Sequence, residues 1–161
     1  MCDRPDQITQ FNGTLEPVLE ADVTEGSGTQ HDPYVIESAE QLKMFLIDGT
    51  KNAANKYAVL STDIVLNARQ NKINVLSQSS IVLNATLDGC GHTFFGLCSE
   101  PFVGTVAGTL KNLNIYTIAA EFMESAAAVC LTNNGLISDV KVYGLGMRYT
   151  RIPATKAAAV V

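Results

Sequence analysis

The sequence predicts an all-β protein built as a parallel β-helix, a solenoid of few coils. Along residues 57–161, short apolar or β-branched runs alternate with Asn, Asp, Gly and Ser, and no segment of helical length separates them. Segments also repeat at unequal spacing, as coils do when they keep their strands and vary their corners. Only 17% of the 161 residues are charged, which suits stacked coils with an apolar interior.

Composition excludes several classes of protein. With 47% hydrophobic residues the chain is too apolar for intrinsic disorder, and it lacks the heptad spacing of a coiled coil. A net charge of −5 with 11 Lys and Arg argues against binding to nucleic acid or to an anionic membrane surface. No run of 18 apolar residues is present, so we predict no membrane span.

We divide the chain into an extended N-terminal arm, residues 1–25, and a β-helix domain, residues 26–161. The arm is polar with scattered apolar residues, and Pro5 and Pro17 argue against a helix within it. The start of the chain lacks the basic and apolar regions of a signal peptide.

One helix is predicted, at residues 38–48. Ser38 is a good N-cap residue, and Gln41 stands three positions later, where a capping box requires it. One face of the predicted helix is apolar, at the helical spacing of Leu42, Phe45 and Leu46.

Short strands account for most of the remaining chain, with Gly and Asn supplying the backbone conformations of the bends. The predicted strands are Tyr34–Ile36, Tyr57–Leu60, Ile64–Leu66, Ile73–Leu76, Ile81–Leu83, Phe94–Leu97, Phe102–Val106, Leu110–Ile115, Ala127–Leu131, Leu136–Val142 and Ala157–Val161.

The repeat consists of two sets of segments. Thr93–Leu97, Thr109–Leu113 and Leu136–Val140 align without gaps, and Ser125–Cys130 aligns with Lys156–Val161. We therefore predict that the segments of each set stack on one another as parallel strands about 4.8 Å apart.

Five motifs in a consistent order resemble bacterial surface or secreted β-helix proteins with GLUG-like repeats, of the adhesin type. The resemblance covers residues 26–161, with Cys90 standing where the family usually has Asn. The motifs are Gly26-Ser27-Gly28-Thr29 with Asp32-Pro33-Tyr34-Val35-Ile36, Tyr57 to Leu66, Leu87-Asp88-Gly89-Cys90-Gly91-His92-Thr93, Gly108-Thr109-Leu110-Lys111-Asn112-Leu113, and Asn133-Asn134-Gly135-Leu136-Ile137.

This resemblance implies a right-handed parallel β-helix whose N-terminal end is covered by the short helix. It also implies secretion or display on a cell surface, commonly as part of adhesins or larger extracellular proteins. It implies no particular enzymatic activity.

The four cysteines, Cys2, Cys90, Cys98 and Cys130, contain no C-x-x-C pair, which argues against a structural zinc site. We expect buried free thiols that pack as small apolar groups. A disulfide between Cys90 and Cys98 is the alternative, because the two residues flank one short strand.

Asp88 and His92 are the candidate polar site, with Asp63 as a further neighbour. They could form an acid–base pair or a metal site, but we expect them to support a turn at a coil corner. No nucleophile elbow, phosphate-binding loop or zinc-protease motif occurs. The sequence therefore predicts no catalytic residue, no metal ligand and no cofactor.

The ends of the chain predict self-assembly. An uncovered solenoid end exposes unpaired backbone groups and an apolar cross-section, which invites another subunit; a continuation of a longer chain would cover it equally well. The predicted assembly interface comprises Phe11, Leu15, Val18, Ala157, Ala158, Val160 and Val161.

We therefore expect a non-catalytic, extracellular structural protein that associates head to tail with copies of itself, as a surface filament or matrix subunit. One alternative is an adhesin module that binds glycan or a host surface protein on a lateral face. The other is a fragment of a polysaccharide-active β-helix enzyme.

Overall fold

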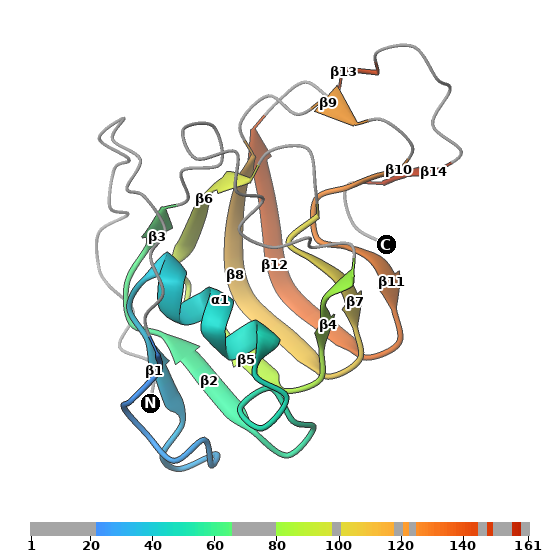
Figure 1. The fold of residues 1–161 in the computed structure, drawn as a ribbon. Coiled ribbons are helices and arrows are strands. Elements are labelled where there is room, and N and C mark those ends of the chain that lie inside the picture. Colours follow the sequence, from blue (N-terminus) through green and yellow to red (C-terminus); the bar gives the residue numbers. More distant parts are fainter. Residues whose placement is uncertain are drawn as a thin grey trace.

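The computed structural model describes residues 22–65, 80–97, 101–117, 121–122, 125–144, 148–149 and 156–158. Its parallel strands form a β-solenoid of about three turns, with a single short helix in the described part of the chain (Figure 1). The predicted fold class is confirmed in this form, and the right-handed sense of the coils stays a prediction. No helix of the described residues is long and apolar enough to cross a membrane.

Three parallel ladders run along the solenoid. The first face is formed, in order, by β1 (Tyr34–Ile36), β2 (Tyr57–Leu60), β5 (Thr86–Asp88), β8 (Thr109–Thr117) and β12 (Leu136–Gly144). The second face is formed by β3 (Ile64–Val65), β6 (Thr93–Leu97) and the later halves of β8 and β12. The third face is formed by β4 (Val82–Leu83), β7 (Val103–Val106) and β11 (Cys130–Asn133).

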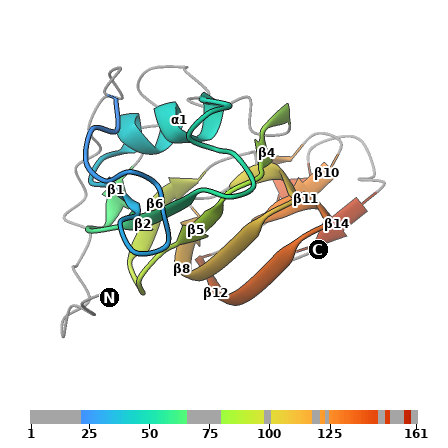
Figure 2. The same cartoon turned by 90° about the horizontal axis from the view of Figure 1, so that it is seen from below.

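Two short ladders extend the later coils. They are β9 (Glu121–Phe122) with β13 (Arg148–Tyr149), and β10 (Ser125–Ala127) with β14 (Lys156–Ala158). Figure 2 shows the stacking order, with β5, β8 and β12 following one another and β12 outermost.

Strands β8 and β12 each serve two faces because they bend at one residue. Asn112 in β8 has φ 52° and Asp139 in β12 has φ 51°. This left-handed backbone conformation is rare in L-residues, and Asn and Asp tolerate it best among them. Between the same two faces, the preceding coil uses a separate turn after β5.

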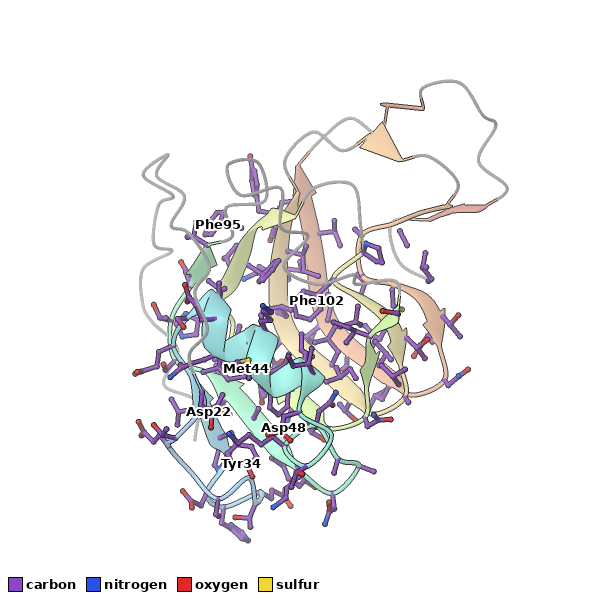
Figure 3. The ribbon with its side chains drawn as sticks, viewed as in Figure 1. Asp22, Tyr34, Met44, Asp48, Phe95 and Phe102 are labelled. Atoms are coloured by element: carbon purple, nitrogen blue, oxygen red, sulfur yellow. The ribbon has the colours of Figure 1, made fainter. Side chains whose placement is uncertain are left out.

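The core consists of inward side chains that stack from coil to coil. Leu87 and Leu110 are register partners with no exposed surface, and Ile137 continues their column in β12. Phe94 and Phe102 meet edge to face inside the solenoid, with ring centroids 5.0 Å apart; Phe102 is labelled in Figure 3. Burial of these columns drives the stacking.

Helix α1 (Ala39–Ile47) covers the N-terminal side of this core, as predicted (Figure 2). The Ser38 hydroxyl accepts a hydrogen bond from the backbone N–H of Gln41 at 3.2 Å, which fixes the first turn. The face that the helix buries comprises Ala39, Leu42, Phe45 and Leu46.

The segment that enters the solenoid, residues 22–25, covers the outer edge of β1; we call it the entering segment. The backbone N–H of Val35 donates to the carbonyl of Glu25 at 3.1 Å. Lys51 pairs with Asp22 and lies 3.9 Å from Asp48, so the entering segment is held beside α1 (Figure 3). The N-terminal end of the solenoid is therefore covered by helix and loop.

The predicted repeat is partly confirmed and partly wrong. Leu136 pairs with Thr109, and Ser125 pairs with Lys156, as the alignments require. Thr93, however, pairs with Asn114, and the true partner of Thr109 is Thr86.

The physical reason lies in strand β5. It is three residues long and runs directly into a glycine-containing turn, so the sequence indicated a turn where a strand stands. The predicted strand Ala127–Leu131 is also interrupted, because β10 ends at Ala127 and β11 begins at Cys130. The predicted strand Ile73–Leu76 lies outside the described residues.

Asn52 ties the helix end to the first coil corner. Its side-chain amide donates to the carbonyls of Leu46 (2.9 Å) and Val82 (2.8 Å). Its carbonyl oxygen accepts from the backbone N–H groups of Asn84 (2.9 Å) and Ala85 (3.1 Å). The side chain is buried, so four backbone groups depend on it.

We expect Asn52→Ala to lower the free energy of unfolding by about 2–4 kcal/mol, because buried backbone groups would lose their partners. Urea unfolding followed by circular dichroism measures this loss. Asn55→Ala, at an exposed position of the same loop, is the matched control and should change the free energy by less than about 0.5 kcal/mol. Equal effects of the two variants would contradict the role of Asn52.

Candidate functional site

The turn between β5 and β6 holds the predicted polar residues. Cys90 has φ 53° and Gly91 has φ 83°, and the chain bends here from the first face to the second, since β5 and β6 both run parallel to β8. The backbone N–H groups of Gly89 and Gly91 donate to the carbonyls of Lys111 (2.8 Å) and Asn112 (2.7 Å) in the next coil. The turn is thus docked on strand β8.

Asp88 organises this turn. Its Oδ1 accepts from the backbone N–H of Cys90 and from Nδ2 of Asn112, both at 2.9 Å. Its Oδ2 lies 3.1 Å from Nζ of Lys111. Each of these contacts either closes the turn or joins it to β8, so the carboxylate stabilises the coil corner.

The same contacts shift the pKa of Asp88. Burial acts to raise the pKa of this carboxyl group, but hydrogen bonds from Asn112, Cys90 and Lys111 and the charge of Lys111 outweigh it. The net result is a pKa below the ordinary value. The folded state therefore favours the carboxylate form.

His92 pairs with Asp63 and has no direct bond to Asp88. Its Nδ1 lies 3.2 Å from Oδ1 of Asp63, and the backbone N–H of Thr93 donates to the same oxygen at 2.8 Å. The two side chains are 9% and 10% exposed. The structure thus divides the predicted polar site into two separate contacts, Asp88 with Lys111 and Asn112, and His92 with Asp63.

One carboxylate oxygen of this pair lacks a hydrogen bond to the described residues. Oδ2 of Asp63 is buried and has no hydrogen-bond partner among the described residues. No group of three or more His, Cys, Asp or Glu side chains that could hold a metal ion occurs in the described ranges. The geometry of the described residues therefore presents a buried carboxylate–imidazole contact between the residue preceding β6 and the residue preceding β3.

The cysteines divide into two kinds. Cys90 is disulfide-bonded, so the expectation of a free thiol was wrong for this residue. Cys130 is free and buried, as expected, and burial raises the pKa of its thiol. Cys2 and Cys98 lie outside the described residues.

The open edge of β12 is the second candidate site. Within the described ranges β12 is paired on one side only, to β8. Its inward residues Ile137, Val140 and Val142 pack against the core but are only partly buried. Leu136, on the outer side, is 56% exposed. Together these residues form an apolar last rung, which we call the open rung.

Two of the predicted assembly residues lie away from the open rung. Ala157 and Ala158 belong to β14, which pairs with β10 rather than forming the open rung. The other predicted interface residues lie outside the described residues; they are Phe11, Leu15, Val18, Val160 and Val161. The sequence carried one signal for the open rung, since Leu136 stands where the two preceding coils place Thr86 and Thr109.

An aromatic column runs along the second face, with Phe95 buried and its two tyrosines exposed. Phe95 and Tyr116 are register partners, as are Tyr116 and Tyr143, so the three rings follow one another on β6, β8 and β12. The centroids of Phe95 and Tyr116 are 5.8 Å apart, and Phe95 is labelled in Figure 3. Tyr116 is 43% exposed and Tyr143 is 47% exposed.

Comparison of the chain with protein-family models, with curated proteins and with solved structures finds no significant match. The features of the described structure that bear on function are the two candidate sites and the aromatic column.

We expect Asp88→Asn to lower the free energy of unfolding by about 1–2 kcal/mol at pH 7, through loss of a charged hydrogen-bond acceptor. The folded pKa lies below the unfolded value, so this stabilisation is present above about pH 3.9 and disappears as the pH falls through the folded pKa. Urea unfolding from pH 2 to pH 8 should show the two proteins converging at low pH.

Glu37→Gln is the control for this series, because Glu37 is an exposed acidic residue outside the turn. A constant difference between Asp88→Asn and the wild type across the whole pH range would refute the assignment.

Proposed function

We propose that this chain is a non-catalytic, extracellular structural protein that associates with copies of itself through the open rung of its solenoid. The observation that carries the proposal is the contrast between the two ends. Helix α1 and the entering segment cover the N-terminal end, while β12 is paired on one side only within the described ranges. Proteins normally cover such edges, because an unpaired strand edge recruits another strand.

The apolar side chains of the open rung favour contact with a second subunit over contact with water. Ile137, Val140 and Val142 are apolar and only partly buried, so a second subunit that covers them gains hydrophobic stabilisation at about 25 cal/mol per Å². Head-to-tail association places the same unequal surfaces in contact at every step and yields a filament or matrix unless the ring closes.

Secretion or surface display forms part of the proposal. The disulfide of Cys90 supports it, because structural disulfides persist chiefly in oxidising compartments outside the cytosol. The polar residues of the β5–β6 turn support the non-catalytic part, since each contact made by Asp88 serves the stacking of coils.

The test is sedimentation of the purified chain over a range of concentrations. We expect species larger than a monomer, and we expect Val142→Lys to shift them towards monomer, because an inward charge on an edge strand opposes pairing. Val82→Lys, at an exposed lateral position of β4, is the matched control and should leave association unchanged. A wild-type chain that stays monomeric at every concentration would remove the proposal.

A second candidate is an adhesin module that binds glycan on its lateral face, and the aromatic column favours it. Exposed, regularly spaced rings offer flat apolar surfaces with polar edges, and Tyr is enriched at binding surfaces for this reason. Tyr116 and Tyr143 provide two such rings on adjacent strands.

This candidate predicts saturable binding to a glycan array by labelled protein. Tyr116→Ala should weaken such binding about tenfold, the equivalent of roughly 1.4 kcal/mol. Ile47→Ala, which removes an exposed apolar side chain from α1, should have no effect on binding. A wild-type protein that binds no glycan on the array would exclude this candidate.

A further inference from the structure

The N-terminal arm contains a segment similar to the sequence that forms one corner of two successive coils. Residues 11–16 (FNGTLE) align without gaps with residues 83–88 (LNATLD) and with residues 106–111 (VAGTLK). The two coil segments are stacked in this same register in the structure. A Gly or Ala followed by Thr-Leu occurs at 13–15, 85–87 and 108–110 and nowhere else in the chain.

At the two later coils the corner leaves no room for a side chain, whereas the first coil accommodates Ala85. A Cβ atom at Gly108 would lie 2.2 Å from the carbonyl oxygen of Ala85 in the preceding coil. A Cβ atom at Gly135 would lie 2.0 Å from the carbonyl oxygen of Gly108. By the same geometry, a strand stacked on β12 needs glycine over Gly135. In the aligned arm segment, that position is Gly13.

The other positions of the arm segment also match the open rung. Along the first face, the backbone N–H of Thr109 donates to Ala85 (3.1 Å) and that of Leu136 donates to Gly108 (2.9 Å). The carbonyl of Gly135 is the next acceptor in this column, and the backbone N–H of Thr14 is its aligned donor. Leu15 would extend the inward column of Leu87, Leu110 and Ile137.

Pro17 sets where the added strand would stop. It aligns with Asn112 and Asp139, the bend residues with φ 52° and 51°. Proline fixes φ near −65°, so the arm cannot follow the bend onto the second face. Proline also lacks a backbone donor, which suits the exposed edge of a stack. A strand added by the arm would therefore end before Pro17.

The arm of the same chain is too short to make this contact. A strand on the open edge of β12 lies five strand spacings from β1, or ~24 Å. The entering segment lies on the other side of β1, where Glu25 binds Val35. The six residue-to-residue steps from Glu16 to Asp22 span at most ~21 Å when fully extended. The distances therefore favour the edge of a neighbouring copy.

We propose that residues 11–16 of one copy add a parallel strand to the open edge of β12 in a second copy, with Gly13 over Gly135 and Leu15 over Ile137. This inference rests on the proposed self-association and names the segment that mediates it. The contact is β-augmentation between unequal surfaces, so it propagates head to tail.

Gly13→Ala in the full-length chain is the first test, because a single Cβ atom should suffice to prevent stacking over Gly135. We expect the dissociation constant for self-association, measured by sedimentation, to rise at least about tenfold. Gly49→Ala is the matched control, because a Cβ atom there meets nothing within 4 Å. It should leave the constant within about twofold of the wild type.

The second test locates the contact. We would place the photo-crosslinker p-benzoylphenylalanine at Leu136, mix chains labelled with ¹⁴N and ¹⁵N, and identify the crosslinked peptides by mass spectrometry. We expect crosslinks to residues 11–16, with both isotopes in one product. The same crosslinker at Val82, on the lateral face, should not reach the arm.

The outcomes separate this inference from the proposed function. Association that survives Gly13→Ala, or crosslinks from Leu136 to another β12 edge, would overturn the role of the arm and leave self-association standing. Crosslinks to the arm within single-isotope products alone would overturn docking on a neighbour. Complete absence of association would overturn both proposals together.

Discussion

Close backbone stacking at the coil corner is the constraint on which the rest of this structure depends. At Gly108 and Gly135, the carbonyl of the preceding coil (Ala85 and Gly108, respectively) occupies the space that a side chain would need. Because the corner fixes the spacing, the strands on both sides meet in register and the inward side chains form continuous columns. The glycines at positions 108 and 135 follow from this one contact.

The solenoid was predictable because apolar and polar residues alternate within each short strand, a pattern visible in a single segment. The register between strands depends instead on contacts between coils. Helix α1 was predictable, since Ser38 and the apolar spacing that follows are signals within one segment. Strand β5 was not, because two or three residues of alternation before a glycine turn carry too little periodicity. The alignment of Thr93 with Thr109 failed for the same reason, since an alternating pattern fits several registers equally well.

The candidate sites show a similar division. Asp88, His92 and Asp63 were identified as residues of interest from their types and spacing, but their partners could not be. Whether Asp88 faces His92 or Lys111 depends on how the turn lies against β8, which is a property of the stacked coils. The open rung was predicted at the end of the sequence, whereas within the described residues it lies on β12, because β14 pairs with the earlier strand β10.

The ladder of the first face also allows the coils to form one after another during folding. Partners along the first face are near in sequence, 23 positions apart for Thr86 and Thr109 and 27 for Thr109 and Leu136, so each coil needs only the coil before it as a template. Strand β8 is held on both sides, whereas β12 in the described structure is held on one. Local stability should therefore decline along the solenoid axis, and amide hydrogens of β12 should exchange with solvent before those of β8. A subunit of this kind has its lowest local stability at the edge where it would contact its neighbour.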